Sequence, residues 1–145
     1  MRTGRPGLLY PAWVVAIVAT LGSLYFSEIR HFPPCTLCWY QRILMYPLVL
    51  LLGVATFKQD RGVLKYALPL SVLGVLVSGY HILVERIPGF GAGVCSSGVP
   101  CNVKYIEWLG FITIPTMSFV AFVLVTVLLV LKANRPRTVA TSPAR

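Results

Sequence analysis

Four long apolar runs dominate this chain and limit what it can fold into. They cover residues 8–26, 39–57, 63–84 and 111–131, and each has about 19 to 22 residues. At about 1.5 Å of rise per residue, a helix of that length crosses the roughly 30 Å hydrocarbon core of a bilayer. Lipid offers no hydrogen-bond partners to the backbone, so such runs form helices. The sequence therefore predicts an all-α membrane protein, an antiparallel bundle of four transmembrane helices.

The composition supports an integral membrane protein with a single domain. Of the 145 residues, 57% are hydrophobic and 12% are charged, which is too apolar for a soluble domain of this size. The first run is longer than the apolar part of an ordinary signal peptide and has no clear cleavage site after it, so we expect it to be retained. We expect one membrane domain over residues 1–132 and a disordered cytoplasmic tail over residues 133–145.

The basic residues predict the orientation in the membrane. The chain has a net charge of +9, and its Lys and Arg residues gather before the first run, in segment 58–65 and in the tail. The positive-inside rule then places both termini in the cytoplasm and segments 27–38 and 85–110 outside. A nucleic-acid-binding surface would need aromatic residues among the basic ones, and this pattern is missing. We therefore expect no nucleic-acid partner.

A short amphipathic stretch follows the last cysteine. The apolar residues Val103, Ile106 and Leu109 alternate there with polar residues, and Tyr105 and Trp108 add aromatic rings. Such a pattern is typical of a helix that lies flat in the headgroup region with its rings at the interface. We predict a short interfacial helix in this second outer loop.

All four cysteines lie between the apolar runs, on the predicted outer side, where disulfides persist. Cys35 and Cys38 form a CxxC motif at the start of the second run, and Cys95 and Cys101 lie in the long loop. A cysteine in the first turn of a helix meets unpaired N–H groups and the positive end of the helix dipole. With Arg42 one turn further on, this arrangement predicts that Cys38 is the more reactive thiolate.

The spacing of the cysteines leaves several interpretations open. The CxxC pair fits a redox-active dithiol better than a structural disulfide, because so small a loop contributes little stability. The loop pair encloses five residues with Gly and Pro, and it fits an exchangeable or a structural disulfide about equally. All four thiols together could bind zinc, but an oxidising outer face disfavours four reduced thiols, and we expect no metal.

Two ionisable residues lie inside the predicted spans near their outer ends. Arg42 and His81 are each three residues inward, about 4.5 Å below the outer surface. There they could donate hydrogen bonds to an apolar carbonyl compound. Equally, Arg42 could extend to the headgroups and His81 could bind a neighbouring carbonyl. Gln41, Ser78 and Tyr80 could add polar contacts, but nothing in the sequence selects them.

The motif CTLCWYQR at residues 35–42, His81 and the later cysteine pair together resemble the DsbB family of disulfide bond formation proteins. Pro100-Cys101 and segment 110–118 resemble its short, BdbC-like branch, and the likeness covers roughly residues 8–131. The resemblance implies a bacterial inner-membrane thiol–disulfide oxidoreductase. Such a protein reoxidises an extracytoplasmic thioredoxin-like partner, similar to DsbA or BdbD, and passes electrons to a membrane quinone, ubiquinone or menaquinone.

The resemblance also implies roles for the four cysteines. Cys95 is the sulfur that the partner's thiol attacks, and Cys101 is its loop partner. Cys35 then exchanges with this second pair, and Cys38 meets the quinone ring. The loop between Cys95 and Cys101 is much shorter than in the longer family members, which bears on the geometry of the exchange.

By the same resemblance, Arg42 and His81 line the quinone site, where Arg42 stabilises developing negative charge. Gln41 stands where the longer family members have an acidic residue, so a carboxylate is missing at that position. Two alternatives remain. One is a quinone reductase similar to vitamin K epoxide reductase, and the other is a non-catalytic membrane assembly factor with structural disulfides.

Overall fold

The predicted four-helix architecture is confirmed. A computed structural model describes residues 7–91, 93–95, 98–104, 106, 107, 109 and 112–135. Its elements are α1 (Leu9–Leu24), a π-helical extension η1 (Tyr25–Ile29), α2 (Thr36–Lys58), α3 (Leu64–Arg86) and α4 (Ile114–Asn134). Each helix, with η1 counted as part of the first, is long and apolar enough to cross a membrane. Of the predicted tail, residues 136–145 lie outside the described residues.

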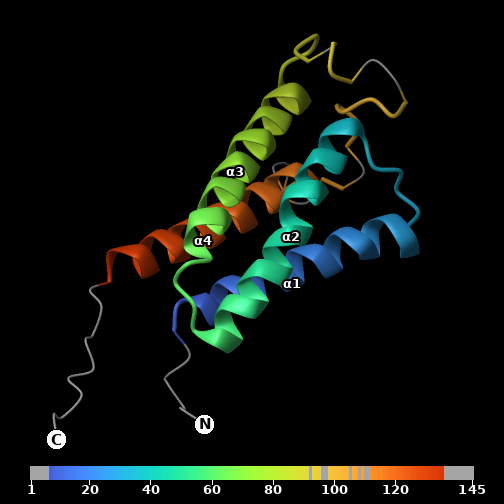
Figure 1. Ribbon diagram of the computed structural model, residues 1–145. Coiled ribbons are helices and arrows are strands. Elements are labelled where there is room, and N and C mark those ends of the chain that lie inside the picture. The colour runs from blue at the N-terminus through green and yellow to red at the C-terminus, as the bar shows by residue number, and fades with distance from the viewer. Residues whose placement is uncertain are drawn as a thin grey trace, which may run out of the picture.

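The helices are arranged around the bundle in chain order (Figure 1). α1 and α3 each pack against both α2 and α4, whereas α2 and α4 barely touch across the diagonal. A tight link makes α2 and α3 antiparallel neighbours. Gln59 ends α2 with φ 53°, and the Asp60 carboxylate accepts a 2.7 Å hydrogen bond from the Gly62 N–H. The start of α1, this link and the end of α4 lie at one end, and the long loop after α3 lies at the other (Figure 1).

The middle of the bundle and the end near the link are held by an apolar core. Leu48, Leu52, Phe122 and Leu129 are fully buried there. Gly74 allows α3 to approach α4 closely, because a Cβ at this position would overlap the ring of Phe122. Small residues at such contacts are how membrane helices gain close packing. The polar side chains of the interior are left mostly to the other end, where the cysteines lie.

The interfacial helix predicted after the last cysteine is not found among the described residues of that stretch. Val103, Lys104 and Glu107 lie outside any helix, with a 2.9 Å ion pair between the last two. Leu109 has φ 54°, a left-handed conformation that an α-helix of L-residues does not accommodate. Residues 105 and 108 lie outside the described part of the chain.

Candidate functional site

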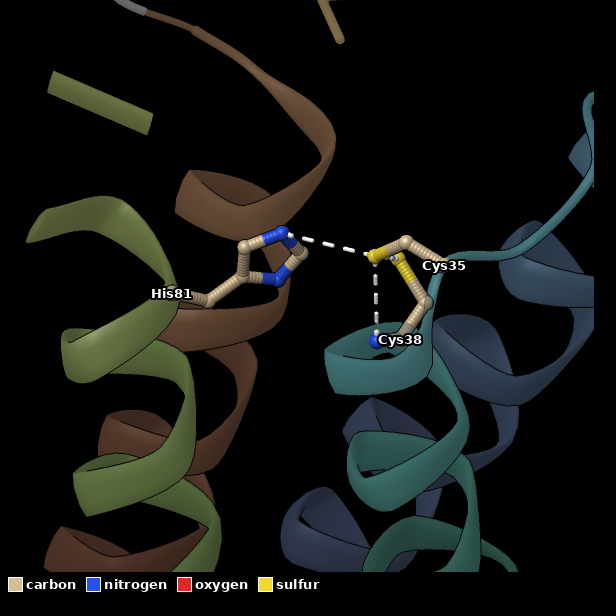
Figure 2. Close-up of side chains that lie close together, drawn as sticks. All are labelled: Cys35, Cys38 and His81. Atoms are coloured by element: carbon tan, nitrogen blue, oxygen red, sulfur yellow. Dashed lines mark hydrogen bonds between the residues drawn. The ribbon is translucent and has the colours of Figure 1, made fainter. Parts of the chain in front are cut away.

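The first cysteine pair forms the start of α2. Cys35 is the N-cap residue, with extended backbone, and its Sγ accepts the backbone N–H of Cys38 at 3.4 Å. Cys38 lies one turn in, and the two sulfur atoms are 3.0 Å apart (Figure 2). Both cysteines are free, so the pair is a dithiol in position to form a disulfide. The CxxC spacing therefore places both sulfurs at the amino end of one helix.

His81 reaches this dithiol from α3 (Figure 2). Its Nε2 atom lies 3.6 Å from the Cys35 Sγ and 3.3 Å from the carbonyl oxygen of Cys101. On the other side of the ring, Nδ1 is 3.0 Å from the amide nitrogen of Gln41. The histidine is 2% exposed, so these contacts are made away from solvent. His81 thus joins the two cysteine pairs, and Gln41 fixes its ring.

The geometry favours Cys35 as the thiolate. The pKa of Cys35 is lowered to about 4. The largest cause is a hydrogen bond from the Cys38 thiol, and a hydrogen bond from His81 acts in the same direction, whereas burial raises the pKa. We predicted the thiolate at Cys38 from its place in the first turn. That expectation differs from the structure because Cys35 is the cap, so the free N–H at the helix start points at the Cys35 sulfur.

The second pair is oxidised. Cys95 and Cys101 form a disulfide with an S–S distance of 2.01 Å. Cys101 is 4% exposed and packs with Cys35, Leu37 and Val84, while Cys95 lies at the edge of the same cluster. All four cysteines are therefore close together at the loop end of the bundle, despite the short loop between the second two.

This pairing rules out a site in which four thiolates bind zinc, since two of the sulfurs are bonded to each other. Cys35, Cys38 and His81 still place three possible ligand atoms within 4.8 Å of one another. Such a set could contact a thiophilic ion, but its sulfurs are those of the dithiol just described.

A large cavity of about 490 Å³ opens beside Cys38, between α1, α2 and α4. Its walls are mostly apolar, and Arg42 provides its charge. The guanidinium donates to the hydroxyl and to the carbonyl oxygen of Ser23, both at 3.0 Å, and lies 5.5 Å from the centre of the Trp39 ring. Arg42 is thereby fixed between α1 and α2 at the cavity wall. Ser23 was not singled out from the sequence.

A second, small cavity of about 30 Å³ also has Cys38 in its wall. Cys35, His81, Glu85 and Cys101 are among its lining residues. Arg42 lines the large cavity, whereas His81 lines the small one, so the shared quinone site that the resemblance implied stays a prediction. They lie at similar depth, but their side chains enter different gaps between helices. Cys38 borders both cavities.

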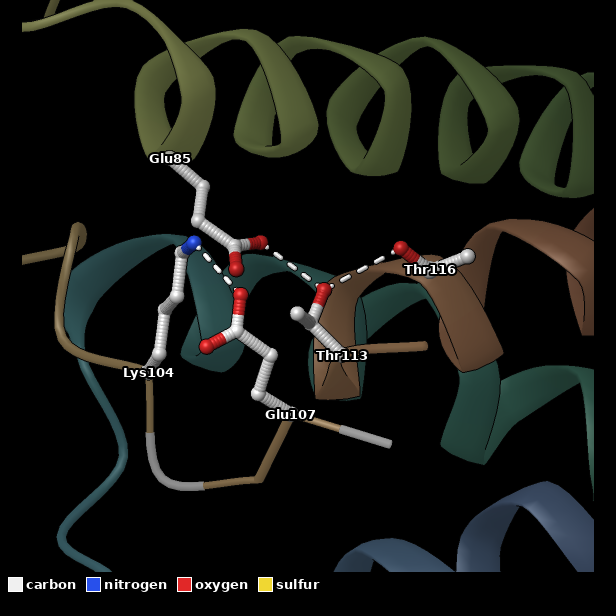
Figure 3. A network of polar contacts seen from close by, with 5 residues as sticks. All are labelled: Glu85, Lys104, Glu107, Thr113 and Thr116. Atoms are coloured by element: carbon white, nitrogen blue, oxygen red, sulfur yellow. Dashed lines mark hydrogen bonds and ion pairs between the residues drawn. The ribbon is translucent and has the colours of Figure 1, made fainter. Parts of the chain in front are cut away.

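Glu85 and Thr113 were also missed by sequence reasoning. The Thr113 hydroxyl donates a 2.8 Å hydrogen bond to Oε2 of Glu85, and it also contacts the Thr116 hydroxyl at 3.1 Å (Figure 3). Glu85 was counted as the first residue of the outer loop, yet α3 continues through it. One signal was available, because Glu85 follows His81 by four residues and so shares its helical face. Ser78, by contrast, only bonds the carbonyls of its own helix.

Comparison with known proteins agrees with the geometry. A family described as "Disulfide bond formation protein DsbB" matches residues 6–132. The chain is 58% identical over 124 residues to "Disulfide bond formation protein C" of Bacillus subtilis (strain 168), covering 85% of this chain and 90% of the relative. It is 48% identical over 120 residues to "Probable disulfide formation protein C 1" of Bacillus anthracis, covering 82% and 86%.

A relative from a different genus is similar to the same extent. "Probable disulfide formation protein" of Coxiella burnetii (strain RSA 493 / Nine Mile phase I) is 50% identical over 125 residues, or 85% of each chain. No solved structure gives a significant match. The four membrane-spanning helices, the dithiol beside a loop disulfide and these matches together show that the chain belongs to the DsbB family of disulfide bond formation proteins.

Proposed function

We propose that this membrane thiol–disulfide oxidoreductase takes electrons from an extracytoplasmic thioredoxin-like dithiol protein and passes them to a membrane quinone, ubiquinone or menaquinone. The observation that carries the proposal is the position of Cys38. It faces the cluster that holds the loop disulfide on one side and a large apolar cavity on the other. A sulfur in this position can receive electrons from the loop cysteines at the end of the bundle and pass them to a compound dissolved in the lipid.

The large cavity fits a quinone. Thr20 Oγ1 and Tyr46 Oη are buried and have no hydrogen-bond partner among the described residues, and both side chains line this cavity. Buried polar atoms are rarely left unpaired in folded proteins, so two hydroxyls of this kind suit a ligand with oxygen acceptors. Thr20 and Tyr46 lie three and four residues deeper than Ser23 and Arg42, about one helical turn or 5.4 Å. The walls thus offer donors at two depths, as a ring with oxygens on opposite sides requires.

A bound quinone would supply the ability to accept two electrons and two protons. The residues of this chain would do the rest. Arg42, held by Ser23, would donate hydrogen bonds and a positive charge to the oxygen near the outer surface. Thr20 and Tyr46 would orient the ring from below, and the apolar walls would exclude water.

Electrons would reach Cys38 through two thiol–disulfide exchanges. A thiolate of the partner would attack Cys95, which is more exposed than Cys101, and release Cys101 as the leaving thiolate. The partner's second thiol would then displace Cys95 from the mixed disulfide, which leaves the partner oxidised and both loop cysteines reduced. The reduced loop pair would then reduce a disulfide between Cys35 and Cys38. The shared packing of Cys35 and Cys101, with His81 in contact with both residues, supports this second exchange. Its products are the loop disulfide and the dithiol that the structure contains.

We also propose that both termini face the cytoplasm of a bacterial cell. The basic residues Lys58, Arg61 and Lys132 lie at the end opposite the cysteines, and Arg61 donates a 3.0 Å hydrogen bond to the carbonyl of Arg135. Positively charged ends favour the cytoplasmic side. An alkaline phosphatase fused after residue 145 should therefore be inactive, since this enzyme folds only outside the cytoplasm. An active fusion would show that the C-terminus faces the outside and would contradict the proposed orientation.

The electron path can be tested without the partner. Purified protein in detergent is reduced, freed of reductant and mixed anaerobically with one equivalent of ubiquinone or menaquinone. We expect two thiols to disappear for each quinone reduced, as counted by alkylation and quinone absorbance. Cys38→Ser should abolish the reaction while the Cys95–Cys101 disulfide still forms, which mass spectrometry of the unreduced variant would verify.

Three results would count against this proposal. Quinone reduction that persists in Cys38→Ser would contradict the proposed electron path. If the number of free thiols in the wild-type protein does not change after quinone is added, a structural role for both cysteine pairs is favoured. Electron flow from quinol to a bound substrate, with no turnover of a thioredoxin-like dithiol protein, would favour the vitamin K epoxide reductase-like alternative.

A further inference from the structure

A buried carboxyl group lines the small cavity that both cysteine pairs also reach. Glu85, in the last turn of α3, is 9% exposed, although it lies at the loop end of the bundle. One carboxyl oxygen accepts the hydroxyl of Thr113, and the other, Oε1, is buried without a hydrogen-bond partner among the described residues (Figure 3). A half-satisfied carboxyl in such a place costs stability, which calls for an explanation in the chemistry of the site.

The small cavity connects this carboxyl to the sulfurs. Glu85 lines it together with Cys35, Cys38 and Cys101, so each cysteine pair has a residue on the same cavity. A volume of about 30 Å³ can hold a water molecule, and polar groups on several sides could bind one there. A water in this position can carry a proton between groups that do not touch.

His81, the obvious base at the site, is poorly placed to take a proton. The nitrogen of the Gln41 amide faces Nδ1, and an amide NH₂ group can only donate. Nδ1 is therefore an acceptor, and Nε2 carries the hydrogen that it directs at Cys35 and at the carbonyl of Cys101. His81 acts as a hydrogen-bond donor to the thiolate with no free lone pair. Apart from the cysteine sulfurs, the carboxylate of Glu85 is the side chain on the described part of this cavity that can accept a proton.

Charge favours the same assignment. A thiolate at Cys35 and a carboxylate at Glu85, both facing one small cavity, would repel each other in a low dielectric. One proton shared between the two groups removes that repulsion. Lys104 also lines the cavity, but its ammonium is paired with Glu107 at 2.9 Å. Thr113, the N-cap residue of α4, is uncharged. The groups that set this balance are therefore the two cysteines, His81, Glu85 and the Lys104–Glu107 pair.

We propose that Glu85 is the proton acceptor of the Cys35–Cys38 site and stores one of the two protons that accompany each electron pair. In the exchange, the loop thiols Cys95–SH and Cys101–SH react with the Cys35–Cys38 disulfide and the Glu85 carboxylate. The products are the loop disulfide, the Cys35 thiolate, the Cys38 thiol and the Glu85 carboxylic acid. Two electrons move from the loop pair to the CxxC pair, and both protons remain in the site, one on Cys38 and one on Glu85.

The inference builds on the proposed function, since it assigns a proton site to the same dithiol. It can nevertheless be tested with a chemical reductant alone. Infrared difference spectra between the oxidised protein and protein reduced with dithiothreitol should show a carboxylic acid C=O band that appears on reduction. The chain has four acidic residues, Glu28, Asp60, Glu85 and Glu107, so the band can be assigned by substitution.

We expect the band to be lost in Glu85→Gln and kept in Glu107→Gln, which removes the acid that pairs with Lys104 at the loop surface. Thr113→Val keeps the acid but removes its hydrogen bond, so the band should remain and shift in frequency. A band that survives in Glu85→Gln, or that is missing from the wild-type protein with both thiol pairs reduced, would overturn the proposal. A protein that shows the band but reduces no quinone would contradict the proposed electron acceptor and leave the role of Glu85 standing.

A second readout detects failure to fold. Glu85→Gln should keep the helical circular dichroism of the wild type and form the Cys95–Cys101 disulfide. Loss of the carboxylic acid band in this folded variant can then be assigned to the missing carboxyl group and not to misfolding.

Discussion

The two cavities that meet at Cys38 differ in size and chemistry. The one between α1, α2 and α4 measures about 490 Å³ and is walled by apolar side chains with Arg42 at its outer edge. The other measures about 30 Å³ and gathers His81, Glu85 and sulfur atoms of both cysteine pairs. The first has room for an apolar molecule from the bilayer, and the second has room for water. The start of α2 thus separates the large cavity, which suits electron transfer to a lipid-soluble compound, from the small cavity, which suits thiol and proton chemistry.

This division has a physical basis. A dithiol that reacts with both a protein and a quinone needs water-like surroundings on one side and lipid-like surroundings on the other. Residues on the first turns of α2 can provide both, because successive positions on a helix face different neighbours. Substitutions in one cavity should therefore leave the chemistry of the other intact.

The largest predicted effect comes from filling the large cavity with a side chain. Gly22 lines it, and a Cβ built there meets nothing within 4 Å, so Gly22→Leu should occupy the cavity without disturbing the helices. We expect quinone reduction to fall roughly ten- to hundredfold, the equivalent of about 1–3 kcal/mol of overpacking. Stopped-flow quinone absorbance would measure it, with Gly22→Ala as the smaller control. Wild-type rates in Gly22→Leu would show that quinone reacts elsewhere.

A smaller effect should follow from removing the charge at the large cavity. Arg42→Met retains much of the packing but loses the guanidinium held by Ser23. The KM for quinone should rise about tenfold, which corresponds to about 1.4 kcal/mol for a charged hydrogen bond. Steady-state kinetics over a range of quinone concentrations would measure this, and Arg30→Met, at an exposed arginine of the first outer segment, is the matched control. An equal rise in the control would assign the effect to surface charge.

The smallest predicted effect belongs to the other cavity. His81→Leu removes a hydrogen bond that lowers the pKa of Cys35, while the larger contribution of Cys38 remains. The pKa should therefore rise only slightly above about 4, so that thiolate absorbance appears at a slightly higher pH than in the wild type. Ultraviolet titration of the reduced protein would measure the shift. His31→Leu, at an exposed histidine, and Arg42→Met should leave it unchanged; a shift in Arg42→Met would mean that the two cavities are not independent.

Much of the fold could be predicted because bilayer thickness fixes helix length. The four runs correspond to α1–α4 with shifts of a few residues at their ends, and all four cysteines lie outside the helix interiors as expected. The stretch after Cys101 was predicted wrongly from alternation alone. Its described residues follow a disulfide and include a left-handed Leu109, and hydropathy patterns do not contain such constraints.

Some residues of the candidate site could be named from the sequence, but their arrangement could not. Depth can be read from residue number, so Arg42 and His81 were rightly placed near one surface. The direction in which each side chain points depends on how neighbouring helices pack, which one sequence does not reveal. The same reason explains Glu85, a charge at the end of an apolar run that looks like a loop residue until α4 brings Thr113 against it.

The cap on α2 has a consequence for the driving force of the reaction. A thiolate at Cys35 accepts the Cys38 N–H and so completes the helix start, whereas a disulfide sulfur carries no charge for that purpose. The reduced form is thereby stabilised over the oxidised form. Each unit by which the pKa of Cys35 is lowered is worth about 1.4 kcal/mol, or roughly 30 mV for a two-electron couple. The helix start would therefore make the CxxC pair a stronger oxidant, and in the proposed electron path it would favour electron transfer to that pair from the reduced loop cysteines.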